Sequence, residues 1–174
     1  MQLTPESAAM MRGMFLGFAE TEQKTTAKVM AAIPDQNHDY KPDAKSKTAM
    51  ELAGHIAEVD CWFLDSMVAG AFNPASMQKA PADTNTGPAM AAWYNEAYKA
   101  SAAKVAAMDT ASLMKVVDFF GMMQLPAVMF LTLLNNHRIH HRGQLSTYLR
   151  AMGGKCPSIY GPSADEEVKA AGAK

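Results

Sequence analysis

The chain has 174 residues, of which 49% are hydrophobic and 19% charged, and its formal net charge is -1. This composition is that of an ordinary globular domain, and the length suffices for one domain with a real core. The balanced charge excludes an electrostatic argument for nucleic acid or an anionic membrane as a partner. The sequence does not open on a basic region followed by an apolar run, and no uncharged apolar run approaches the roughly 18 residues of a membrane span. We therefore expect one domain over residues 1–174, located in the cytoplasm, with Cys61 and Cys156 as reduced thiols.

The first of four predicted long helices runs from Thr4 to about Ala32. Thr4 can cap its N-terminus, Pro5 suits the first helical position, and Ile33-Pro34 ends it. Hydrophobic residues recur along it at helical spacing: Met10, Met11, Met14, Phe15, Phe18, Val29 and Met30. A polar, turn-rich connection follows over residues 34–47, in which we expect His38 to be a solvated loop residue.

The second and third helices are predicted at about 49–69 and 88–108, joined by a linker without apolar periodicity. Ser46 or Thr48 can cap the second helix. Its apolar stripe consists of Leu52, His55, Val59, Trp62, Ser66 and Val68. One side of the third helix carries Met90, Trp93, Tyr94, Ala97, Tyr98 and Val105. A lone histidine on an apolar face, such as His55, is more often a core residue with its hydrogen bonds satisfied than a metal ligand.

The helical pattern is interrupted over residues 115–126, after a short turn through Met114. Hydrophobic β-branched and aromatic residues flank Gly121 there, which indicates a small extended or hairpin-like segment. Pro126 is expected in the first turn of the fourth helix, which runs to about Met152, and the last ~12 residues of the chain are expected to fray. Four long amphipathic helices predict an all-α, antiparallel four-helix bundle whose long connections allow a non-sequential arrangement.

The fourth helix contains three of the five histidines within five residues. His137 and His141 are four residues apart, so they lie on one face, about 6 Å apart along the axis. Leu134 and Leu145 continue the same stripe, so both imidazoles should point into the bundle, where an unpaired polar group costs about 1–3 kcal/mol. A metal ion would satisfy both rings, with His55 as a third ligand from a facing helix.

The spacing alone fits equally well a pair in which one histidine is buried and the other is hydrogen-bonded. His140 points elsewhere on the helix and is predicted to be a surface or supporting residue. The metalloprotease motif is excluded, because Arg138 stands where that motif requires a glutamate as general base.

These residues lie in segments that resemble the DinB/YfiT-like family of metal-dependent four-helix proteins. The similarity extends from the first helix to about Gly161, and its most specific part begins at His137. It is carried by the following segments: Ile33-Pro34, Tyr40-Lys41-Pro42, ELAGHIAE at 51–58, HRIHHRGQL at 137–145, YLRAMGG at 148–154 and PSIYG at 157–161.

The resemblance implies an up-down-down-up bundle, expected as a homodimer, in which His55, His137 and His141 bind a divalent metal. Imidazole suits zinc, nickel, iron and copper, so the identity of the metal stays open; we expect zinc or nickel, with iron as a further candidate. Position 138, often acidic in relatives, is arginine here, and we expect this difference to alter the residues that support His137 or the charge near the site.

The resemblance also implies a metal-dependent enzyme, either a hydrolase or a transferase that uses a low-molecular-weight thiol on a small electrophilic substrate. Cys61 lies six residues after His55 on another face, and Cys156 follows the helix end, so the thiol would come from a cosubstrate. The alternative is a non-catalytic, stress-associated bundle in which the metal is structural. Asp60, Asp118 and Gln144 are the candidate acid/base groups, and none is assigned a catalytic role.

Overall fold

The structure is a computed structural model that describes residues 3–166. The α-helices of this part of the chain are α1 (Pro5–Ala31), α2 (Ala49–Ala69), α3 (Gly87–Ala106), α4 (Thr110–Met114) and α5 (Phe130–Ala151). Strands β1 (Val116–Phe119) and β2 (Met123–Pro126) form a hairpin, and short 3-10 turns occupy η1 (Pro74–Ser76) and η2 (Ala127–Met129). None of the described helices combines the length and apolar character that a membrane crossing requires.

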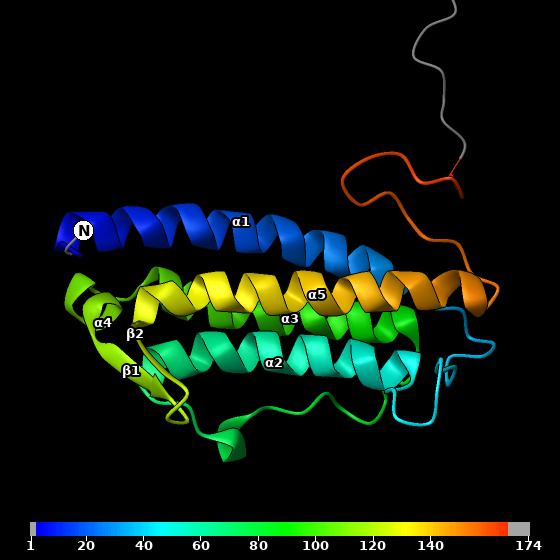
Figure 1. The fold of residues 1–174 in the computed structure, drawn as a ribbon, viewed down its shortest axis with the longest axis horizontal. Helices are drawn as coiled ribbons and strands as arrows, with labels where there is room; N and C mark the ends of the chain where they lie inside the picture. Colours follow the sequence, from blue (N-terminus) through cyan, green and yellow to red (C-terminus); the bar gives the residue numbers. More distant parts are fainter. Residues whose placement is uncertain (1–2, 167–174) are drawn as a thin grey trace, which may run out of the picture.

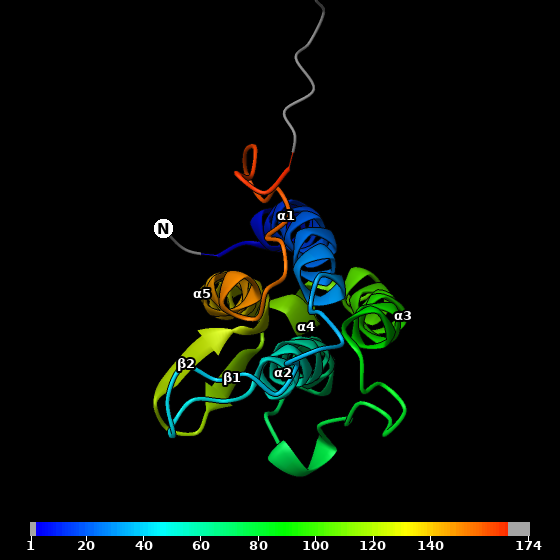
Figure 2. The same ribbon diagram turned by 90° about the vertical axis from the view of Figure 1, so that its right-hand side faces the viewer.

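The four long helices form an up-down-down-up bundle, as the resemblance implied. Helices α2 and α3 run in the same direction, because the linker between them returns along the whole bundle before α3 begins (Figure 1). Each of α1 and α2 packs against both α3 and α5, so α1 and α2 are diagonal in the bundle (Figure 2). Helices α2 and α5 are therefore direct neighbours although 60 residues separate Ala69 from Phe130 in the sequence.

The helix boundaries follow local signals that the sequence contains. Thr4 caps α1 and accepts a hydrogen bond from the Ser7 amide, and Pro5 occupies the first turn. Thr48 caps α2 in a capping box with Glu51. These observations confirm the predicted starts of both helices.

The predicted extended segment is an antiparallel hairpin in which Val117 pairs with Leu125. Its loop consists of Phe120, Gly121 and Met122. Phe120 and Gly121 have φ angles of 54° and 70°, the positive values of a tight turn that the Met122 amide closes on the Phe119 carbonyl. The expected place of Pro126 was wrong, since this residue ends β2. The Ala127 amide donates to the Lys115 carbonyl and extends the pairing, so α5 begins only after the η2 turn.

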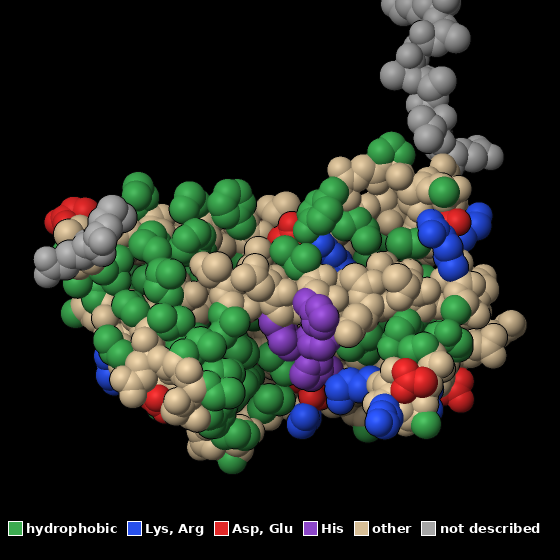
Figure 3. Space-filling model, viewed as in Figure 1, with side chains coloured by type: hydrophobic (Ala, Val, Ile, Leu, Met, Phe, Trp, Pro, Cys, Tyr) green, Lys and Arg blue, Asp and Glu red, His purple; other side chains and the backbone are tan. Residues whose placement is uncertain are grey.

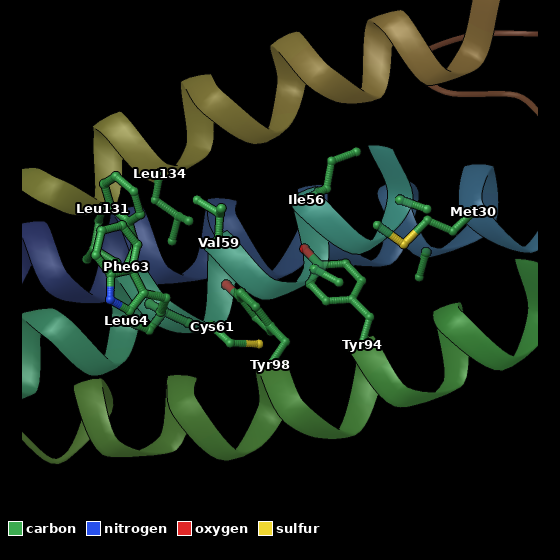
Figure 4. Packing of buried hydrophobic residues seen from close by; sticks show 14 of the residues in the cluster. Met30, Ile56, Val59, Cys61, Phe63, Leu64, Tyr94, Tyr98, Leu131 and Leu134 are labelled. Atoms are coloured by element: carbon green, nitrogen blue, oxygen red, sulfur yellow. The ribbon is translucent and has the colours of Figure 1, made fainter. Parts of the chain in front are cut away.

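The core lies along the axis between the four long helices and is built from large aliphatic and aromatic side chains (Figure 4). Tyr94 of α3 and Leu134 of α5 are both fully buried there.

The hydrophobic residues of α1 do not all lie on one buried face of the helix. Met10, Met14 and Phe18 are 67%, 47% and 59% exposed, because their stripe points away from the bundle while Ala8 and Ala19 face the core. Val68 of α2 is likewise exposed.

The chain after α5 folds back over α1 and α5 (Figure 2). Asp165 pairs with Arg150 at 2.8 Å, and Glu166 accepts a hydrogen bond from the Ser158 amide. The first part of the segment that was expected to fray, residues 163–166, therefore has defined partners. Its remainder, residues 167–174, lies outside the described residues.

Candidate metal centre

Three histidines from two neighbouring helices meet at one point of the bundle surface. His55 comes from α2, and His137 and His141 come from successive turns of α5. The ring centroids are 5.1 Å apart for His55 and His137, 4.7 Å for His55 and His141, and 4.4 Å for His137 and His141. One ring nitrogen of each lies within 4.8 Å of the others, so the three residues can hold one metal ion.

The hydrogen bonds around the rings indicate which nitrogens face the cluster. The Nε2 atoms of His55 and His137 are 3.2 Å apart. Nδ1 of His141 lies 2.7 Å from the Gln144 side-chain oxygen, which accepts its hydrogen and leaves the Nε2 lone pair free. Nδ1 of His137 is buried and has no hydrogen-bond partner among the described residues. Gln144, one turn further along the same helix, therefore orients the His141 ring.

The cluster favours neutral imidazoles, which are the form that binds metals. Burial lowers the pKa of His55 to about 4, and the neighbouring His141 adds to this effect. Burial also lowers the pKa of His137 to about 3, with further contributions from His141 and His55. A set of three imidazole nitrogens fits zinc, nickel or iron and would leave coordination positions for a small ligand.

Arg138 lies on the other side of α5, away from the histidine cluster. It is fully buried and pairs with Asp60 of α2, which is also fully buried. The same guanidinium donates to the Ala19 carbonyl of α1 and lies 4.8 Å from the ring centroid of Tyr98 in α3. Asp60 also accepts the Tyr94 hydroxyl. This polar network connects all four long helices, and nothing in the local pattern of the sequence indicated it.

Arg142, which follows His141, repeats the arrangement of Arg138. Arg142 is 2% exposed, pairs with Glu22 of α1, and donates to the Tyr160 hydroxyl at 2.5 Å. Tyr160 in turn donates to Glu22 at 2.8 Å. Arg142 thus joins α5 to α1 and to the segment that follows α5.

The structure also places His140 and the two carboxylates that the sequence offered as acid/base candidates. His140 is exposed and lies outside the three-histidine cluster, as predicted. Asp60 is committed to Arg138, and Asp118 accepts the Gly121 amide in the hairpin turn. Both carboxylates therefore support the fold.

Neither cysteine has the character of an activated nucleophile. Both are free thiols. Burial raises the pKa of the Cys61 thiol to about 12 and also raises that of Cys156, so both stay protonated at neutral pH. A thiolate nucleophile would have to come from another molecule.

The histidine cluster reaches the surface beside a groove of about 710 Å³. His55 lines this groove, together with residues of the loop before α2 and of the linker after it. Figure 3 shows the histidines as one patch, with hydrophobic side chains on one side and charged side chains below. His137 stacks on the hydrophobic residue Phe63, and the ring centroids are 6.3 Å apart. Sequence periodicity missed the groove, because loops form much of its wall.

The sequence and the fold are both similar to those of known proteins. The chain is 29% identical to the uncharacterized protein YrdA of Bacillus subtilis over 161 residues, which are 89% of this chain and 91% of YrdA. The fold matches a DinB-like protein, YjoA, from Bacillus subtilis with a TM-score of 0.67, at 24% identity over 80% of this chain and 92% of that one.

A DinB-like protein from Bacillus cereus also matches, with a TM-score of 0.67 at 23% identity over 84% of this chain and 95% of that one. The profile of the DinB family matches residues 9–170, nearly the whole chain, and this range includes the three clustered histidines. The chain therefore belongs to the DinB family.

Proposed function

We propose that this protein is a metal-dependent enzyme that transfers a low-molecular-weight thiol to a small electrophile, with His55, His137 and His141 as the metal ligands. The observation that carries the proposal is the convergence of three imidazoles within 4.8 Å beside an open groove. A divalent metal in this cluster would act as a Lewis acid and favour the thiolate form of the cosubstrate at neutral pH. The family assignment supports the metal site, and the thiol chemistry is our inference from it.

The surrounding residues have distinct tasks in this proposal. Gln144 holds the His141 ring through Nδ1, and Phe63 packs against His137 on the apolar side. In the transfer step a sulfur–carbon bond forms while the bond from that carbon to its leaving group breaks. The leaving group departs with the bonding electron pair, and the proton of the thiol passes to solvent through the groove.

A purely structural metal is less well supported by the contacts. Such a metal would serve to join α2 to α5, but the buried Arg138–Asp60 pair already joins these helices. Among residues 3–166 the cluster consists of three histidines, and a structural zinc site normally has four protein ligands. The half-buried rings beside a groove fit a site with a position for substrate.

The metal site is tested by elemental analysis of the purified protein and of four alanine variants. We expect about one metal ion per chain in the wild type and loss of that ion in His55→Ala, His137→Ala and His141→Ala. His140→Ala is the matched control, since this exposed histidine lies on the same helix outside the cluster, and it should keep the metal. Stoichiometric metal in all three cluster variants would refute the site.

The chemistry is tested with metal-loaded protein, an aryl halide as electrophile, and a panel of small thiols. Thioether formation should depend on both thiol and metal, should stop when a chelator is added, and should return when the metal is restored. The same rate before and after chelation would contradict the proposal. Metal binding without any thioether product under all conditions would leave a metal-binding protein and overturn the transferase assignment.

A further inference from the structure

The groove beside His55 is lined by polar residues, here called its rim, and by methionines, here called its floor. Its rim residues come from the loop before α2, from α2 itself and from the linker that follows: His38, Lys47, Glu51, His55, Glu58 and Lys79. Its floor includes Met50, Met77 and Met90. A volume of about 710 Å³ is in the range of small-molecule sites. Since His55 is also a cluster histidine, a molecule in this groove would reach the metal centre at one end.

Both carboxylates on the rim already have hydrogen-bond partners. Glu58 accepts from Lys79 Nζ at 2.8 Å and from the Ala80 amide at 3.0 Å, and its side chain is only 16% exposed. Glu51 accepts from the Thr48 amide at 2.8 Å in the capping box of α2. Both carboxylates therefore stabilise the walls of the groove, and Glu58 fixes the linker against α2.

Lys47 is the positive group that these contacts leave available. It is exposed, it lines the groove, and none of the ion pairs among residues 3–166 includes it. It directly precedes Thr48, the cap of α2, so its position relative to His55 is set by the helix. Seven residues lie between Lys47 and His55, and six of these are in α2, so the two residues are about two helical turns apart along α2. The flexible lysine side chain shortens the distance that a ligand must span.

We propose that the groove selects a thiol cosubstrate with a carboxylate at its far end, which Lys47 binds while the sulfur lies at the histidine cluster. The methionine floor would contact the apolar chain between the two ends, because methionine side chains adapt to ligands of irregular shape. This inference rests on the proposed function, since it takes the histidine cluster to be the site of the sulfur. It adds a specificity determinant outside the metal ligands.

The test compares two thiols of equal length, mercaptohexanoate and mercaptohexanol, on protein loaded with cobalt(II). Thiolate-to-cobalt charge-transfer absorption reports binding of the sulfur, so no turnover is needed. We expect the wild type to bind the carboxylate thiol about fivefold more tightly, a preference of the size that one exposed charge pair provides. High salt should reduce this preference, because exposed charges are screened.

Lys47→Met should abolish the preference for mercaptohexanoate while it leaves the affinity for mercaptohexanol unchanged. Lys45→Met is the matched control, since Lys45 is exposed in the same loop but does not line the groove, and it should retain the preference. Equal affinities in the wild type, or an unchanged preference in Lys47→Met, would overturn the inference. Failure of the wild type to bind cobalt, or cobalt without thiolate absorption for either thiol, would instead overturn the proposed function.

Discussion

Two faces of α5 differ in what their side chains contact. The dipeptide His-Arg occurs twice with a spacing of four residues, as His137-Arg138 and His141-Arg142. The histidines meet His55 at the surface and are half-buried, whereas both arginines are buried and paired with Asp60 and Glu22. Adjacent residues on a helix point in different directions, so each arginine is separated from the histidine beside it.

The two faces differ in what their polar groups are paired with, although Nη2 of Arg138 and Oδ1 of Asp60 have no hydrogen-bond partner among the described residues. On the arginine face, Asp60 accepts from Arg138 and Tyr94, and Arg138 also donates to the Ala19 carbonyl. On the histidine face, the Nε2 atoms of His55 and His137 have only each other as partners among the described residues. The buried charges are committed to the fold, and the imidazoles keep lone pairs available for a ligand.

The largest expected effect comes from breaking the arginine face. Arg138→Met leaves the Asp60 carboxylate buried without its cation and should lower the free energy of unfolding by about 3–5 kcal/mol in urea denaturation. Lys104→Ala is the control, because Lys104 pairs with Asp65 at the surface, and it should cost no more than about 1 kcal/mol. A similar small loss in both variants would show that the buried network does not determine stability.

A second, smaller effect tests the support of the histidine face. Gln144→Ala removes the acceptor of the His141 Nδ1 hydrogen and should weaken metal affinity about 10- to 100-fold without changing the stoichiometry. Competition with a metal indicator measures the affinity. Asn136→Ala, at an exposed position on the same helix, should bind metal like the wild type, and an equal loss in both variants would refute the specific role of Gln144.

The stability of the metal-free protein should depend on pH through the histidine face. The folded state lowers the pKa of His55 to about 4 and of His137 to about 3, whereas both are near 6.5 in the unfolded chain. The unfolded chain therefore binds more protons below pH 6.5. This contribution to stability is fully present above about pH 6.5 and is lost as the pH falls towards the folded-state values.

Urea denaturation of the metal-free protein at a series of pH values from 7 to 5 measures this loss. The effect should be modest, because both rings are partly open to solvent, whose screening reduces it. Metal-free His137→Ala should have a shallower dependence, and the difference between the two proteins isolates the histidine from carboxylates that titrate nearby. A wild type that gains stability relative to His137→Ala on acidification would contradict the expected sign.

The smallest effect is expected at the outer end of the arginine face. Tyr160→Phe removes the hydroxyl that links Arg142 to Glu22, but the tyrosine is 71% exposed, so water can replace it. We expect a loss of only about 0.5 kcal/mol in the free energy of unfolding. Protease sensitivity of the segment after α5 should rise, and unchanged cleavage would show that other contacts hold this segment.

Much of the fold was predictable because its signals are local. Thr4 and Thr48 cap helices through atoms within a few residues, and the positive φ of Gly121 belongs to a tight hairpin turn. The start of α5 was misjudged, since Pro126 suits either a helix start or a strand end, and the pairing with β1 decided between them. The homodimer that the family resemblance implies stays a prediction.

By itself, the sequence determined the four long helices and the shared face of His137 and His141, because helical spacing sets the angle between side chains on one helix. The family resemblance identified His55 as their partner. Only the tertiary structure decided that Arg138 meets Asp60, that Met10 and Phe18 face outward, and that Lys47 stands on a groove beside the cluster. These features depend on which segments lie opposite one another after packing. The spacing of residues along a single helix does not determine which segments it packs against.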